Sequence, residues 1–169
     1  ALYPGVTHLD FTGPHQVLCR LPNSKVTVAS MGGQDITADG LTFGNLADLS
    51  KVEHCDLLCV PGGFGTTDAM LDEAFMAEIR RLGGGAKYLT SVCTGSLILA
   101  AAGFLRGKRA ACHWAWRDLL VPFGAIVDES RVVLLLSHPC VCRTVDAGSV
   151  GETLYIALEV VEGIDVRHL

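Results

Sequence analysis

A single cysteine, Cys93, stands in the stretch "YLTSVCTGSLIL", where a strand-like run gives way to a helix-like run. The residues two positions before and after it, Ser91 and Gly95, are small, as a sharp strand-to-helix turn that presents a nucleophile requires. At the apex of such a turn the sulfur would lie beside the first free N–H groups of a helix starting at Thr94, and those groups favour the thiolate. We therefore predict that Cys93 is a nucleophile. The alternative is a buried cysteine that only fills space.

A glycine-rich loop, "VPGGFGTT", follows another apolar run and contains Gly62 and Gly63. Backbone N–H groups in such a loop can stabilise developing negative charge, so we predict an oxyanion-binding or substrate-binding role for these two glycines. The same letters are also compatible with a simple turn. The loop lacks the lysine of a phosphate-binding P-loop and does not match the dinucleotide-binding pattern.

An aspartate near the chain start, Asp10 in "HLDFTGP", is the third candidate. We interpret Thr12–Pro14 as a loop that opens a helix over His15–Leu21. In this reading the carboxyl group of Asp10 reaches the sulfur of Cys93 and shares a proton with it, so that the two groups titrate as one coupled pair. The alternative is that Asp10 only caps the helix.

The elements that must position these residues alternate between strands and helices. The pattern predicts strands at 25–30, 56–60, 87–92, 109–112 and 131–136, and helices at 15–21, 66–82, 94–102, 113–124 and 150–162. Short connections between alternating strands and helices are typical of an α/β fold with a parallel sheet covered on both faces. In such sheets ligands bind beyond the carboxyl ends of the strands, where Cys93 and the glycine loop should both lie.

Composition limits the class of protein. With 169 residues we expect one domain over 1–169, and 13 Lys+Arg against 18 Asp+Glu leave no basic tract, which argues against nucleic acid as a partner. The longest apolar run, Leu97–Leu105, is too short to span a membrane. Seven cysteines, an odd number, and a start without a signal-peptide pattern favour reduced thiols and a cytoplasmic location.

Three segments together resemble a known family: "YLTSVCTGSLILAAAGFLRGKRAACHWAWRDLL", "VPGGFGT" and "LDFTGP". They are similar to bacterial isocyanide (isonitrile) hydratases, members of the ThiJ/PfpI branch of the class I glutamine amidotransferase-like superfamily, from about Tyr3 to about Val133. The resemblance implies a flavodoxin-like sandwich and hydration of small-molecule isocyanides to N-substituted formamides without cofactor or metal. It also implies that Cys93 is the nucleophile that forms a thioimidate, that Asp10 is its acidic partner, and that Thr94 assists.

Further positions have weaker assignments. Thr94 hydrogen-bonds the sulfur or the substrate, or is only an end residue of its helix. His113 in "CHWAW" lines the cleft or is a structural histidine. Trp114 and Trp116 are two residues apart, so on a helix at most one of them walls an apolar pocket; we assign Trp114. The motif His138-x-Cys140-x-Cys142 is too crowded to make a convincing metal site, so we predict none.

The sequence departs from the family pattern in two places. The start, "ALYPGV", retains only the last residues of the family's first strand or none of it, and residues 134–149 diverge from the family. The apolar composition still favours the homodimer that is usual in the family.

Two alternative functions follow from the same motifs. One is another thiol-dependent reaction of the superfamily, of the glyoxalase, deglycase or stress-related kind, although those relatives usually present a glutamate where this chain has Asp10. The other is a ligand-sensing domain without catalysis, like the domains of AraC-type transcription regulators, which carry similar "CTG" and "HW" segments. Oxidation of Cys93 in a redox sensor is compatible with each of these functions.

Overall fold

The computed structural model describes residues 1–129, 144–150 and 153–158 of the chain. Its contacts divide the chain into two compact units, Ala1–Arg131 and Val132–Leu169, which are described separately here. The expected single domain over 1–169 stays a prediction. Within the described ranges, no helix has both the length and the apolar character that a membrane span needs.

The first unit contains most of the described helices and strands. In chain order these are α1 (His8–Leu18), β1 (Ala29–Ser30), the 3₁₀ helix η1 (Met31–Gly33), β2 (Ile36–Ala38), β3 (Leu41–Phe43), β4 (Ala47–Asp48), the 3₁₀ helix η2 (Leu49–Lys51), β5 (Leu57–Val60), α2 (Thr66–Leu71), α3 (Glu73–Gly85), β6 (Tyr88–Ser91), α4 (Gly95–Ala101), β7 (Arg109–Ala110), the 3₁₀ helix η3 (Arg117–Phe123) and β8 (Ile126–Val127). The second unit contains β9 (Thr144–Val150) and β10 (Thr153–Leu158), which pair antiparallel.

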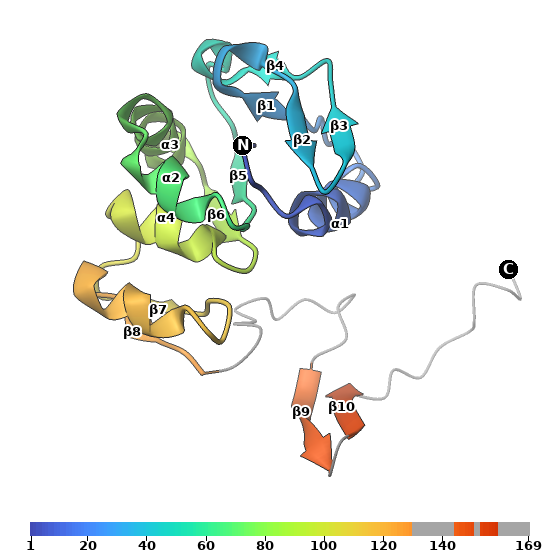
Figure 1. Cartoon of the computed structure of the whole chain (residues 1–169), viewed down its shortest axis with the longest axis vertical. Coiled ribbons are helices and arrows are strands. Elements are labelled where there is room, and N and C mark those ends of the chain that lie inside the picture. The colour runs from blue at the N-terminus through green and yellow to red at the C-terminus, as the bar shows by residue number, and fades with distance from the viewer. Residues whose placement is uncertain (130–143, 151–152, 159–169) are drawn as a thin grey trace, which may run out of the picture. The chain divides into compact units, whose positions relative to one another are not determined.

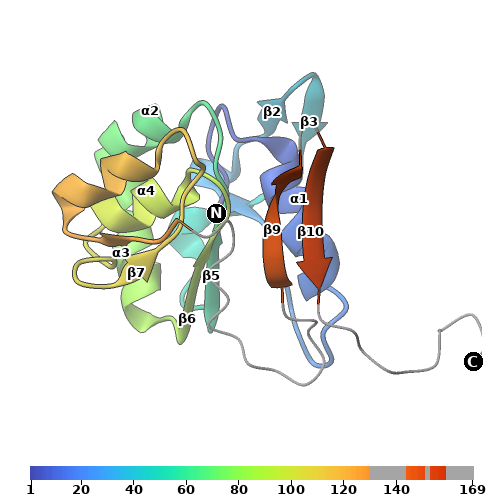
Figure 2. The same ribbon diagram turned by 90° about the horizontal axis from the view of Figure 1, so that it is seen from below.

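Parallel pairs of strands form the framework of the first unit. β5 pairs with β6, β1 with β4, and β7 with β8, all in parallel, while β2 and β3 form an antiparallel hairpin. Figures 1 and 2 show α2, α3 and α4 on one side of β5 and β6, with α1 on the other side. This arrangement is the predicted α/β fold, and it brings the carboxyl ends of β5 and β6 to the same edge, where the glycine loop and Cys93 follow.

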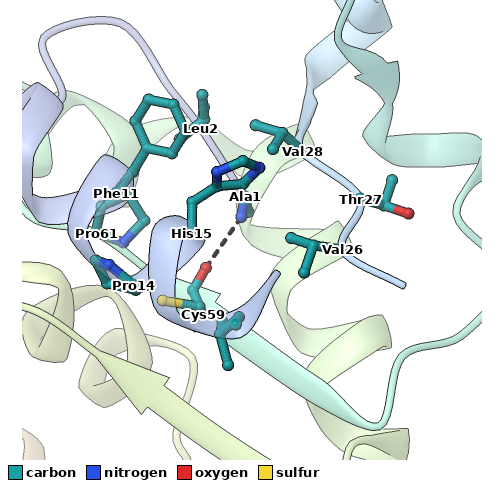
Figure 3. Close-up of a pocket in the computed structure, with 11 residues that line it drawn as sticks. Ala1, Leu2, Phe11, Pro14, His15, Val26, Thr27, Val28, Cys59 and Pro61 are labelled. Atoms are coloured by element: carbon teal, nitrogen blue, oxygen red, sulfur yellow. Dashed lines mark hydrogen bonds between the residues drawn. The ribbon is translucent and has the colours of Figure 1, made fainter. Parts of the chain in front are cut away.

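The first residues of the chain lie between two strands. The backbone N–H of Leu2 donates to the carbonyl of Ala29 in β1 at 2.7 Å, and the amino group of Ala1 donates to the carbonyl of Cys59 in β5 at 3.0 Å. Figure 3 shows this second bond in a small cavity of about 50 Å³. Ala1 and Leu2 are therefore hydrogen-bonded to two different strands without forming a strand themselves.

Helix α1 begins earlier than the sequence pattern predicts. It starts at His8 rather than His15, with Thr7 as its N-cap residue, and runs through Pro14 to Leu18. Asp10 is therefore neither in a loop nor a cap but in the first helical turn, where a carboxylate is favoured by the helix dipole. The prediction failed because "TGP" favours a loop, whereas here the Thr12 hydroxyl bonds back to the carbonyl of His8 at 2.9 Å within a continuing helix.

The helix predicted over 66–82 is two helices. Asp72 has an extended backbone between α2 and α3, and its Oδ1 atom accepts the N–H groups of Ala74 at 3.0 Å and Phe75 at 3.1 Å. These bonds make Asp72 the N-cap of α3. The second helix then continues through Gly83–Gly85, which the sequence pattern had suggested as its end.

The other strand and helix predictions have mixed outcomes. The strands at 56–60 and 87–92 and the helix at 94–102 are confirmed to within one or two residues at each end. The strands predicted at 25–30 and 109–112 are shorter in the structure, where only β1 and β7 form. The segment 113–124 contains the 3₁₀ helix η3 instead of an α-helix. The strand predicted at 131–136 lies outside the described residues.

The helix predicted at 150–162 was wrong. Where the structure describes this segment, it contains the end of β9 and all of β10. The apolar residues of "TLYIAL" fit both the 3.6-residue period of a helix and the two-residue period of a strand. Thr, Tyr and Ile favour a strand when a neighbouring strand is available for pairing.

The core of the first unit is built mainly on α3 and the strands beside it. Phe75, Met76 and Ile79 project from one face of α3 into a cluster that includes Val60 of β5. The ring of Tyr3 packs edge to face on Phe75, with the ring centroids 5.6 Å apart. This packing anchors the chain start to the helical layer.

Replacement of Asp72 by alanine should destabilise the protein by about 1 kcal/mol, because two N–H groups at the start of α3 lose their acceptor. Urea unfolding followed by circular dichroism measures the change. Asp68→Ala is the matched control, since Asp68 makes no side-chain hydrogen bond to a described residue. Equal effects of the two substitutions would contradict the assignment of Asp72 as a cap.

Candidate active site

Cys93 occupies a sharp turn between β6 and α4. Its φ angle is +54°, in the left-handed region that residues with a side chain rarely adopt. The turn is tight because α4 packs against the end of β5: a Cβ atom on Gly95 would overlap the carbonyl oxygen of Val60. Strained backbone of this kind costs about 1 kcal/mol or more and is concentrated at functional sites. The geometry is that of a nucleophile elbow, as the small residues around Cys93 predict.

Backbone pairing with the glycine loop fixes the start of α1. The N–H of Thr7 donates to the carbonyl of Gly62 at 2.9 Å, the N–H of Gly65 donates to the carbonyl of Gly5 at 3.0 Å, and Val6 forms an isolated bridge with Gly63. Since Asp10 lies in the first turn that follows Thr7, these bonds also place its carboxylate.

Gly62 lies at the point where Asp10 and Thr94 meet. A Cβ atom on Gly62 would lie 2.6 Å from the Thr94 nitrogen, 2.7 Å from its Oγ1 atom and 2.9 Å from Oδ2 of Asp10. Only glycine fits at these distances. Oδ2 of Asp10 is itself buried and makes no hydrogen bond of standard geometry to a described residue. A buried acceptor without a partner is unusual in a native structure and suggests a functional role.

Burial is the main influence on the thiol of Cys93 and raises its pKa, and the negative charge of Asp10 raises it further. The N–H and hydroxyl groups of Thr94 act in the opposite direction, because they hydrogen-bond the thiolate. The sequence pattern predicted a thiolate favoured by the helix start, whereas the net effect at this site favours the thiol. The proton is therefore retained beside the sulfur at neutral pH.

A chain of hydroxyl groups continues from Thr94 into the core. Its Oγ1 atom lies 2.7 Å from Oγ1 of Thr66, which in turn lies 3.1 Å from the hydroxyl oxygen of Tyr3. The N–H of Gly63 donates to the Thr94 oxygen at 3.0 Å, so this N–H is already used and does not point at a substrate. Sequence reasoning assigned neither Tyr3 nor Thr66 a role at the site.

A cavity of about 270 Å³ opens beside Cys93 and Thr94. Its walls include Phe64 from the glycine loop, together with His113 and Trp116 from the segment after β7. Phe64 is 98% exposed and Trp116 is 39% exposed. The predicted pocket residue Trp114 does not line this cavity and is 74% exposed, because 113–116 is a turn rather than a helix.

The site thus brings together most of the residues that the sequence singled out. Cys93, Asp10, Thr94, Gly62 and Gly63 converge at the ends of β5 and β6, and His113 faces the same cavity. Among the described residues, no group of three or more His, Cys, Asp or Glu side chains could hold a metal ion. The motif at 138–142 lies outside the described ranges.

Comparison with known proteins places the chain in a family. Its sequence matches the DJ-1/PfpI family over residues 1–161. The chain belongs to the DJ-1/PfpI family. It is 45% identical over 135 residues to an isonitrile hydratase from Pseudomonas putida, a match that covers 78% of this chain and 58% of that protein.

Other DJ-1/PfpI relatives support the same fold. A ThiJ/PfpI family protein from Pseudomonas syringae superposes with a TM-score of 0.75 at 41% identity, over 78% of this chain and 56% of that one. Deglycase PH1704 from Pyrococcus horikoshii is 29% identical over 108 residues, covering 64% of this chain and 62% of that protein. The chain therefore spans less than two thirds of the length of these DJ-1/PfpI relatives. The flavodoxin-like α/β fold expected from the sequence is confirmed.

Removal of the charge on Asp10 should make Cys93 more reactive toward an alkylating agent near neutral pH. In Asp10→Asn the thiolate no longer faces a carboxylate, so the pKa of Cys93 falls and alkylation by iodoacetamide becomes about tenfold faster. Alkylation is measured as a function of pH. Mass spectrometry of the peptide that contains Cys93 distinguishes this thiol from the exposed thiol of Cys19. An unchanged or slower rate in Asp10→Asn would show that the carboxylate does not act on the sulfur.

Proposed function

We propose that this protein hydrates isocyanides to N-substituted formamides, with Cys93 as nucleophile and Asp10 as proton donor and acceptor. The observation that carries the proposal is the carboxylate of Asp10 beside the elbow thiol, with a buried Oδ2 atom that accepts no hydrogen bond of standard geometry from a described residue. The identity to an isonitrile hydratase supports it, and the chemistry follows from the geometry.

The first step joins the sulfur to the terminal carbon of the isocyanide. As the S–C bond forms, the thiol proton passes to Asp10 and from there to the same carbon, which gives a thioimidate, R–N=CH–S. The raised pKa of Cys93 suits this step, because the proton that the carbon needs is still in the site when the substrate arrives.

The second step consumes water. Water adds to the thioimidate carbon as the nitrogen takes up one proton, and the resulting tetrahedral carbon bears the hydroxyl, the amine and the sulfur. The C–S bond then breaks, the hydroxyl proton returns through Asp10 to the sulfur, and the formamide R–NH–CHO leaves. Over one cycle the product gains the elements of one water molecule and the thiol is regenerated, because a proton from water replaces the thiol proton that passed to the carbon; neither an oxidant nor a reductant is needed.

The cavity supports an apolar or aromatic group R. Phe64 and Trp116 provide aromatic surface beside Cys93. Apart from the Cys93 thiol, His113 is the one titratable side chain among the described residues that line this cavity. An aromatic ring of a substrate can stack on such side chains, while the isocyanide carbon reaches the sulfur. The similarity to deglycase PH1704 raises a deglycase reaction as the alternative function.

Loss of the thiol or of the carboxyl group should abolish or strongly reduce hydration. With cyclohexyl or 4-nitrophenyl isocyanide, Cys93→Ala should lower kcat by roughly a thousandfold or more, and Asp10→Asn by about a hundredfold. Formamide release, followed by chromatography, measures both. No turnover by the folded parent protein would refute the hydratase proposal, and turnover of methylglyoxal-modified amines instead would favour the deglycase.

Substitution of Trp116 tests the aromatic wall. Trp116→Ala should raise KM for an aromatic isocyanide about tenfold and change kcat little. The substitution removes a contact with the group R but leaves Cys93 and Asp10, which react with the isocyanide carbon, in place. Trp114→Ala is the comparison, since Trp114 lies outside the cavity lining and is largely exposed. A larger effect at Trp114 than at Trp116 would restore the sequence-based assignment of Trp114 to the pocket.

A further inference from the structure

The side chain of Phe64 is the most exposed large apolar side chain in the described part of the chain, at 98%. Its ring pairs with no other aromatic ring among the described residues. Single exposed apolar residues are common on protein surfaces and need no special explanation. Phe64 differs from them because it also lines the cavity beside Cys93.

The backbone on both sides of Phe64 is fixed by hydrogen bonds. The N–H of Gly63 donates to Oγ1 of Thr94 at 3.0 Å, and the N–H of Gly65 donates to the carbonyl of Gly5 at 3.0 Å. The loop therefore cannot turn the Phe64 ring into the core without breaking these bonds. The ring is held at the cavity although it packs on almost nothing there.

The cavity has a size that fits a substrate with one ring. Its volume of about 270 Å³ lies slightly below the range of roughly 300–1,000 Å³ that is usual for pockets that bind drug-sized ligands. Trp116, the other aromatic side chain that lines the cavity, is 39% exposed, so more than half of its surface is already covered by the protein. Phe64 is therefore the lining ring with the most surface to bury against a ligand.

We propose that Phe64 is a specificity-determining residue that selects single-ring aryl isocyanides over saturated isocyanides of the same size. The inference rests on the proposed function, which puts the group R of the isocyanide in this cavity. Contact with the Phe64 ring buries apolar surface of any substrate ring. Only an aromatic ring adds the offset-stacked or edge-to-face interaction between π systems. Phe64 contacts the group R rather than the isocyanide carbon, so its effect falls on KM.

Two substitutions separate the contribution of apolar surface from that of the aromatic ring. Phe64→Leu keeps an apolar side chain and removes the ring, whereas Phe64→Ala removes both. Phe64→Leu should raise KM for phenyl isocyanide about three- to tenfold and leave KM for cyclohexyl isocyanide within about twofold of the parent value. Phe64→Ala should raise both KM values, and the value for phenyl isocyanide more. The kcat values should stay nearly constant.

Leu71→Ala is the matched control. Leu71 lies in α2, is 76% exposed and is not one of the residues that line the cavity. Its replacement should change neither KM value. Thermal unfolding should be the same for the parent protein and all three variants, because both side chains lie largely in water.

A binding measurement that needs no turnover uses the product formamides as ligands. Formanilide and N-cyclohexylformamide carry the same two rings, and each should slow the alkylation of Cys93 by iodoacetamide in the parent protein. In Phe64→Leu the concentration of formanilide that gives half-maximal protection should rise about three- to tenfold. The corresponding concentration of N-cyclohexylformamide should change by less than about twofold.

The outcomes distinguish this inference from the proposed function. If formanilide protects Cys93 less well in Phe64→Leu but the parent protein turns over no isocyanide, the hydratase proposal fails and the aryl selectivity of the site stands. Equal effects of Phe64→Leu on the phenyl and cyclohexyl ligands, or no effect on either, would overturn the selectivity. A change of elution volume in size-exclusion chromatography of Phe64→Ala, with both KM values unchanged, would also overturn it, because the ring would then contact another copy of the chain.

Discussion

The site depends on the backbone pairing between Gly5–Thr7 and Gly62–Gly65. These hydrogen bonds connect the chain start, which carries Asp10, to the loop that follows β5. Since β5 is paired with β6 in parallel register, the same loop is held beside the elbow that follows β6. Three segments that are far apart in the sequence therefore meet through main-chain bonds, whose geometry depends little on side-chain identity. The exceptions are the glycines of these segments: a Cβ atom on Gly65 would overlap the carbonyl oxygen of Pro4, one on Gly63 would overlap that of Gly5, and one on Gly62 would occupy the space that Asp10 and Thr94 share.

This arrangement sets the electrostatics of the thiol. A cysteine at a helix start is often activated as a thiolate, but here burial and the Asp10 carboxylate outweigh the hydrogen bonds from Thr94. A permanent thiolate would be a strong nucleophile and would also react with oxidants and other electrophiles. A thiol that shares its proton with a neighbouring carboxylate becomes a nucleophile only as that proton moves. For addition to a carbon that must itself be protonated, holding the proton in the site is an advantage.

The sequence predicted the elbow and the strands β5 and β6, which lead to the site, because both depend on local residue types. Small residues around Cys93, the apolar runs of β5 and β6 and the glycine loop are short-range signals. The start of α1 was missed because "TGP" favours a loop, and the break at Asp72 was missed because one helix and a capped pair of helices have almost the same apolar spacing. The helix predicted at 150–162 was wrong because a strand pairing, which no local pattern reveals, determines the structure of the described part of that segment.

Tyr3 and Thr66 were missed for a different reason, which also explains how the site is held. Thr66 belongs to the glycine-loop segment, but no local pattern gives it or Tyr3 a role; each acquires its position only when the chain start packs on α3 and α2 lies against α4. The Tyr3 ring contacts Phe75 in the core, while its hydroxyl bonds to the carbonyl of Pro61 and lies beside Thr66, and burial raises the pKa of that hydroxyl to about 12. Tyr3 therefore stays protonated near neutral pH, where it can donate one hydrogen bond and carries no charge. Because the same side chain fills the core and ends the chain of hydroxyl groups, a change in the packing of Tyr3 would also disturb the hydrogen bonds of Thr66 and Thr94 beside Cys93.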